Sequence, residues 1–218
     1  MPISTSATGP VHTPYAEDWI NGLYNRLFCD RPQDMQAQAG TPAAPWQAAL
    51  CGPAPDLRAA AAIVADRSAE SRVRLLACHV LRAHGSDVPT RELLGVVIEV
   101  PLEGSLDTLA AYVDGSVRYL HHSGKVEMVE PMAALLPLVK QLAEASAAVV
   151  SRIGPWDKPR LPAPRPGNIR LSFLVSDGLY FGEGDMQVMM RDGMAGPIIA
   201  HATELMQAVI ALARKRAA

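Results

Sequence analysis

Residues 93–130, LLGVVIEVPLEGSLDTLAAYVDGSVRYLHHSGKVEMVE, contain the turn signals that decide the fold. An Asp-Gly dipeptide at 114–115 and a Ser-Gly dipeptide at 123–124 are typical of hairpin turns, because glycine tolerates the positive φ that such turns need. A Glu-Gly-Ser corner at 103–105 gives a third break. The stretch therefore predicts four consecutive β-strands.

The chain ahead of these strands predicts helices over residues 16–86. Apolar residues recur there at helical spacing. Asp56 and Ser68 are the expected N-caps of two of these helices, and Gly85 is expected to end the second one. Residues 1–15 are polar and interrupted by proline and glycine, which predicts a flexible arm.

The chain after the strands predicts two helices and one more hairpin. Pro131 suits the first turn of a helix whose apolar stripe runs through residues 135–153. Residues 154–168 are rich in proline, which favours an extended crossover. A hairpin around the Asp-Gly pair at 177–178 then leads to a last helix over 197–214.

This order of elements predicts an α+β fold. We expect an antiparallel β-sheet of about six strands with helices packed on a face, preceded by the all-helical N-terminal region. Residues 87–218 would form the sheet domain, including the proline-rich crossover. At 218 residues, the chain is expected to form one compact unit with the helical region.

Composition excludes several classes of protein. Hydrophobic residues make up 49% of the chain and charged residues 19%, which excludes global disorder. The net charge of −2 argues against nucleic-acid binding. The sequence shows no secretory signal pattern and no run of about 18 apolar residues, so we expect a cytoplasmic protein with no membrane partner. The three cysteines fit neither a disulfide framework nor a CxxC site.

Two-residue turns in the hairpins would fix which side chains lie opposite each other. Asp107 would then lie opposite His122, with Lys125 next across. A carboxylate beside an imidazole is the smallest unit for general acid–base chemistry, so these three residues are the candidate catalytic group. An ordinary cross-strand pair is the structural alternative. The same register predicts that the helix over 135–153 packs on a face carrying Thr108, Ala110, Tyr112, Val117, Tyr119, His121, Val126 and Met128.

Other polar features are weaker. His121 and His122 would point to opposite faces of a regular strand, so we expect no metal site there. The glycine-rich stretch at 182–196 lacks any nucleotide-binding pattern and is expected to be a structural loop. Cys78 lies on one helical ridge with two arginines, Arg74 and Arg82. Nearby cations can lower a thiol pKa, whereas a half-buried structural cysteine is the alternative. The candidate binding residues are Arg118, His122, Trp156 and Glu183.

The runs AYVDGSVRYLHHSGK at 111–125 and GPWDKPR at 154–160 resemble those of an uncharacterised bacterial protein family of similar length. That resemblance implies no activity. The element order is similar, more distantly, to profilin-like folds such as roadblock and longin domains. This second resemblance implies a sheet used for dimerisation or for binding small molecules and partners, and it does not by itself assign a function.

These observations favour a small interaction or ligand-binding protein without catalysis of its own and without a cofactor. A homodimer is expected. One alternative is an enzyme that uses Asp107 and His122, with Lys125 or Arg118 as an anion clamp. Another is a structural subunit of a larger complex that docks through residues 156–166.

Overall fold

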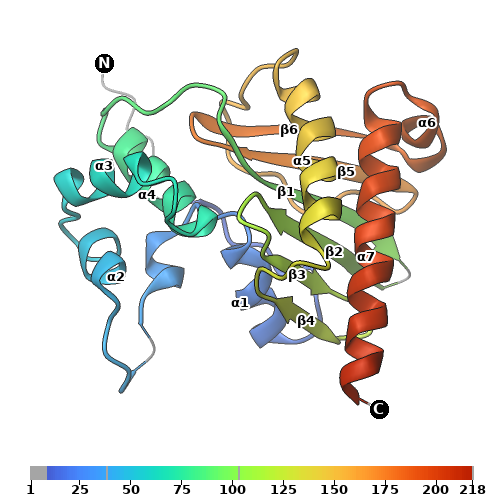
Figure 1. The fold of residues 1–218 in the computed structure, drawn as a ribbon, viewed down its shortest axis with the longest axis horizontal. Coiled ribbons are helices and arrows are strands. Elements are labelled where there is room, and N and C mark those ends of the chain that lie inside the picture. Colours follow the sequence, from blue (N-terminus) through green and yellow to red (C-terminus); the bar gives the residue numbers. More distant parts are fainter. Residues whose placement is uncertain (1–8, 38, 103, 218) are drawn as a thin grey trace.

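The fold is a six-stranded antiparallel sheet with helices on both faces (Figure 1). The structure, a computed structural model, describes residues 9–37, 39–102 and 104–217. The α+β class and the helical region ahead of the strands are confirmed. The strand order is β4-β3-β2-β1-β5-β6, which places β1 and β2 in the interior of the sheet. The strands are β1 (Leu93–Leu102), β2 (Ser105–Tyr112), β3 (Val117–Leu120), β4 (Val126–Val129), β5 (Asn168–Val175) and β6 (Gly178–Asp185). Glu103, in one predicted corner, lies outside the described residues.

The N-terminal helices cover one face of the sheet, and the later helices cover the other (Figure 1). The first group comprises α1 (Asp18–Arg26), the short 3-10 helix η1 (Pro32–Met35), α2 (Pro45–Leu50), α3 (Leu57–Ala65) and α4 (Ser71–Ala83). The second comprises α5 (Leu136–Val150), α6 (Met186–Arg191) and α7 (Ala195–Ala217). Each group closes its own hydrophobic core, so the sheet is buried from both sides.

Helix ends test the predicted caps. The Asp56 carboxylate accepts hydrogen bonds from the first-turn N–H groups of α3, which confirms it as an N-cap. Gly85 follows α4 with φ of +71°, as a left-handed terminating residue should. The Ser68 prediction is wrong, because its hydroxyl donates to Asp66 at 2.6 Å and α4 begins only at Ser71. The Pro131 prediction is also wrong, because α5 begins at Leu136 with a different proline, Pro137, in its first turn.

Both predicted two-residue turns are wrong by one residue. The N–H of Tyr112 donates to the carbonyl of Ser116 at 2.9 Å, so three residues form the loop and the glycine, Gly115, is its last. Its φ of +95° identifies the left-handed position that ends a three-residue hairpin loop. The next hairpin repeats this geometry, with the N–H of His121 donating to the carbonyl of Lys125 at 2.8 Å.

The extra loop residue shifts the pairing of β3 with β2 by one residue from the predicted register. Such a shift places every side chain of β3 on the opposite face of the sheet relative to β2. Tyr112 therefore points toward the N-terminal helices, where its hydroxyl donates to the carbonyl of Leu27 at 2.8 Å. Tyr119 lies on the opposite face, in the core with α5 and α7. The predicted face that combined these two tyrosines is wrong.

Two segments expected to be irregular are held by specific contacts. The loop predicted for the glycine-rich stretch is wrong over residues 182–191, because β6 continues to Asp185 and α6 follows it. The side chains of Asp185 and Asp192 accept hydrogen bonds from the N–H groups that follow them. In the expected N-terminal arm, residues 1–8 lie outside the described residues, but Tyr15 is buried and its hydroxyl is 2.8 Å from that of Thr108. Residues 154–168 cross from α5 to β5, and Arg160 within them is buried.

A buried polar network joins this crossover to the sheet. Glu99, in β1, is fully buried and pairs in register with Arg170 of β5. The Tyr24 hydroxyl of α1 donates to Glu99 Oε1 at 2.7 Å, while Arg170 Nη1 lies 3.7 Å from Glu99 Oε2. Arg160 donates to Asn25 Oδ1 at 2.9 Å and stacks over Tyr24. Helix α1, the crossover and two strands therefore share one buried cluster.

Helix α7 is long and apolar enough, by length and composition, to cross a membrane. A third of that window is buried within the fold, and core helices of soluble proteins pass the same test. This finding is weak evidence for a membrane span. The expected cytoplasmic location stays a prediction.

Removing the Tyr24 hydroxyl should destabilise the protein, because the Glu99 carboxyl would lose its only close donor among the described residues. We expect Tyr24→Phe to lower the free energy of unfolding by about 1–3 kcal/mol in urea denaturation. Tyr180→Phe is the matched control, since that buried tyrosine donates over 3.2 Å to the half-buried Asp177. An equal loss in both variants would contradict the special role of Tyr24.

Glu99 should also make stability depend on pH. Burial raises the pKa of its carboxyl, although Arg170 opposes the shift. The folded chain therefore binds more protons than the unfolded chain between the ordinary glutamate pKa and the raised one, so the free energy of unfolding falls as the pH rises through that interval. Glu99→Gln should remove this fall, measured as the difference between the two proteins in denaturation at pH 4 to 8. Parallel curves for both proteins would overturn the assignment.

Candidate functional site

Two hollows lie along α7, on the face of the sheet that α5, α6 and α7 cover. The first, the α6–α7 cavity, has a volume of about 310 Å³. Its walls are mostly apolar side chains from α6, α7 and four strands: Ile98, Val100, Leu102, Asp107, Leu109, Tyr119, Ile169, Met186, Met190, Ile199, Ala202, Thr203 and Met206. The second, the β3–α7 groove, has a volume of about 440 Å³ and is lined by Tyr119, His121, Lys125, Glu127, Ile210, Ala213 and Arg214.

Tyr119 lines both hollows and carries a polar group to their junction. Its hydroxyl donates to Asp107 Oδ2 at 3.0 Å. Burial raises the pKa of Tyr119, and the neighbouring carboxylate raises it further, so the phenol stays protonated and remains a donor. From the sequence, we expected Tyr119 to pack beneath a helix and assigned it no such role.

Asp107 and His122 lie together, as the sequence analysis predicted, but through a different geometry. The β2–β3 ladder ends at Thr108 and Leu120, so His122 lies in the hairpin loop and not in a strand. The loop turns it back onto the carboxylate: Asp107 Oδ1 is 2.7 Å from the His122 backbone N and 3.0 Å from its ring Nδ1. The His122 side chain is 39% exposed, so the pair lies at the surface.

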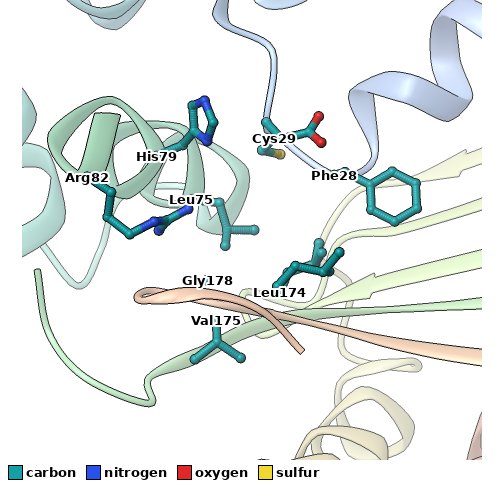
Figure 2. Close-up of a pocket in the computed structure, with 10 residues that line it drawn as sticks. Phe28, Cys29, Leu75, His79, Arg82, Leu174, Val175 and Gly178 are labelled. Atoms are coloured by element: carbon teal, nitrogen blue, oxygen red, sulfur yellow. The ribbon is translucent and has the colours of Figure 1, made fainter. Parts of the chain in front are cut away.

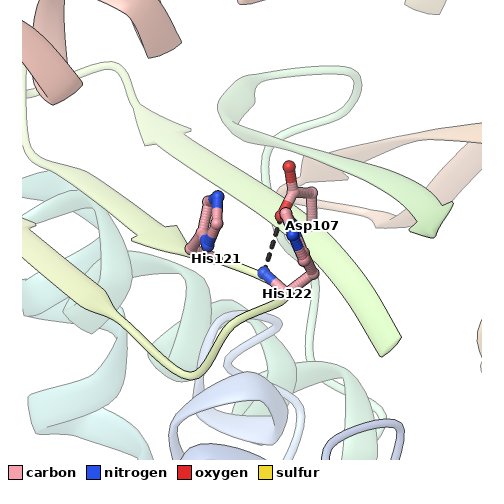
Figure 3. Close-up of side chains that lie close together, drawn as sticks. All are labelled: Asp107, His121 and His122. Carbon is pink, nitrogen blue, oxygen red and sulfur yellow. Dashed lines mark hydrogen bonds and ion pairs between the residues drawn. The ribbon is translucent and has the colours of Figure 1, made fainter. Parts of the chain in front are cut away.

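The same loop brings His121 into the group (Figure 3). We expected adjacent histidines to diverge, as they do in a regular strand. That premise is wrong here, because the two imidazole rings lie only 4.0 Å apart between centroids. One ligand atom from each of Asp107, His121 and His122 lies within 4.8 Å of the other two. Lys125, which was predicted beside the pair, lines the β3–α7 groove with His121.

The other predicted binding residues lie apart from this group. The Arg118 guanidinium is buried, donating to backbone carbonyls and to Glu130. Glu183, on β6 at the other end of the strand order, accepts from Arg170 at 2.6 Å. Trp156 donates to the carbonyl of Pro159 and packs against Phe181. None of these three residues lines either of the hollows described above.

A smaller cavity lies between α4, the end of α1 and the β5–β6 turn (Figure 2). His79, Arg82 and Cys29 line it, which is a set of groups found at nucleophilic sites. Its volume is only about 50 Å³, which is room for little more than a water molecule. Burial also raises the pKa of Cys29 to about 12, so this thiol is not the reactive thiolate.

Cys78, on α4, is likewise a structural residue. Its side chain is buried, and burial raises the pKa of its thiol to about 11, although Arg82 and Arg74 oppose the shift. Desolvation outweighs the two cations, so the structural alternative stated from the sequence holds, with the side chain fully rather than half buried. The three cysteines are free, as their spacing predicted.

No protein-family model matches the chain, and no curated protein matches it in sequence. Family membership therefore contributes nothing to the site, and the resemblances drawn from the sequence stay predictions. The geometry alone identifies the region of interest: two apolar hollows under α7, joined at Tyr119, with Asp107, His121 and His122 at their edge.

Proposed function

We propose that this protein binds a small, mostly apolar molecule in the α6–α7 cavity and performs no chemistry of its own on it. The observation that carries the proposal is the cavity itself. Its volume of about 310 Å³ lies at the lower end of the range for ligand pockets, and its lining combines apolar walls with few polar groups. The Asp107 carboxylate, the Tyr119 hydroxyl hydrogen-bonded to it, and the Thr203 hydroxyl provide those polar groups.

The lining also suits an occupant that enters and leaves. Met186, Met190 and Met206 contribute flexible, polarizable side chains that adapt to different shapes. Met190 is 53% exposed and Leu102 39% exposed, so the rim of the cavity reaches solvent. These exposed apolar side chains would be covered by a bound apolar molecule, which supplies a hydrophobic driving force for binding.

The position of His122 favours binding over catalysis. The enzyme alternative requires Asp107 and His122 to act on a molecule in a cleft. Asp107 lines the α6–α7 cavity, but His122, whose ring would carry the proton, lines neither of the two hollows. The pair therefore supports an enzyme less well than a binding site. The expected homodimer stays a separate prediction.

We expect a neutral apolar dye, N-phenyl-1-naphthylamine, to bind with a rise in fluorescence. Thr203→Trp should weaken binding about tenfold or more, since Thr203 is exposed at the cavity lining and a larger side chain there would fill the space. Ala200→Trp is the control, because Ala200 is exposed on the same helix and does not line the cavity. Circular dichroism checks that both variants fold. Equal dye affinity in the two variants, or no binding by the unaltered protein, would refute the proposal.

A further inference from the structure

We propose that Asp107, His121 and His122 form a binding site for a divalent transition-metal ion of the Zn²⁺ type. Two imidazoles and one carboxylate are ligands that such ions take in proteins, and three protein ligands leave coordination positions open. This metal site goes beyond the binding of an apolar molecule and does not depend on it.

The three side chains are already grouped closely enough for one ion. Their ligand atoms lie within 4.8 Å of one another. In the tetrahedral geometry that Zn²⁺ favours, bonds of about 2.0–2.2 Å place two ligand atoms about 3.3–3.6 Å apart. Closing the group around an ion therefore needs the ligand atoms to move together by roughly 1 Å. His122 can make that movement, because its side chain is 39% exposed and lies in a loop.

Neighbouring groups orient these ligands. The Nδ1 of His121 lies 2.7 Å from the Ser123 hydroxyl, and the Nδ1 of His122 lies 3.0 Å from Asp107 Oδ1. The Ser123 contact leaves Nε2 of His121 to bind the ion. On His122 the ion would replace the hydrogen bond between Nδ1 and Asp107, so that this nitrogen and the carboxylate bind the ion together. The Tyr119 hydroxyl fixes the other oxygen of Asp107 at 3.0 Å. Hydrogen bonds of this kind are typical supports of metal ligands.

The local charge also suits a dication. With both imidazoles neutral, the three ligands carry one negative charge from Asp107. The β3–α7 groove beside His121 carries the cations Lys125 and Arg214, and the carboxylate of Glu127 offsets one of them. The buried cysteines, whose pKa values burial raises, are poor competitors for the ion.

Zinc titration of the full chain against a chromophoric chelator at neutral pH tests the site. We expect one tight site per chain, weakened about tenfold or more by His121→Ala, by His122→Ala and by the near-isosteric Asp107→Asn. His84→Ala is the control, because this exposed histidine lies at the end of α4, far along the chain from the group, and should leave the affinity unchanged.

Cobalt provides a second readout of the ligands. Bound Co²⁺ should show visible absorption bands without the intense near-ultraviolet band of thiolate ligation. A thiolate band, an absence of zinc binding, or equal zinc affinity in the unaltered protein and the His122→Ala variant would each overturn the site. Because these titrations contain no apolar dye, and the dye titration contains no added metal, the two proposals can fail separately.

Discussion

The buried carboxyl of Glu99 is the constraint on which the arrangement of this molecule depends. It lies in β1, whose neighbours are β2 on one side and β5 on the other, and it is fully buried. A buried carboxyl is costly unless polar groups surround it. Here the partners come from separate parts of the chain: Tyr24 from α1 and Arg170 from β5. Satisfying Glu99 therefore requires the N-terminal helices and the last hairpin to meet at the same place on the sheet.

The same network explains why the proline-rich crossover has a fixed path. Arg160 is buried, and its guanidinium donates to Asp30 and Asn25. The guanidinium carbon also lies 4.0 Å from the centroid of the Phe28 ring. A guanidinium with these partners is held by charge, hydrogen bonds and stacking together. Arg160 therefore anchors the crossover within the fold. Most other residues of the crossover are exposed, and the docking role considered for this segment stays a prediction.

Local patterns predicted the elements well and their exact register poorly. Asp-Gly and Ser-Gly located both hairpins, because glycine supplies the positive φ wherever the loop needs it. The same dipeptides occur in two-residue and three-residue loops, so they do not fix the loop length. That ambiguity placed Tyr112 and Tyr119 on one face. A serine ahead of an apolar stripe is likewise not always a cap. The Ser68 hydroxyl donates to the side chain of Asp66 instead of accepting from a helix N–H.

The candidate site shows which information a sequence lacks. Asp107 and His122 were paired from a register that is wrong by one residue, and the loop restores their contact by folding His122 back. His121 was excluded by a rule for regular strands that does not hold at a loop. The size of the hollows under α7 depends on the spacing between this helix and the sheet. Because α7 follows β3 by more than seventy residues of chain, no local sequence pattern predicts that spacing.

The composition of α7 links these observations. This helix has the hydropathy of a membrane span, yet only a third of the relevant window is buried in the fold. Part of the remainder is explained by the hollows, because Met206 faces the α6–α7 cavity and Ile210 faces the β3–α7 groove. Both side chains are partly buried and pack against the core, so only part of their apolar surface faces the hollows. The two hollows therefore account for part of the apolar surface of α7 that the core leaves uncovered, and the length and hydropathy of this helix stay weak evidence for a membrane span.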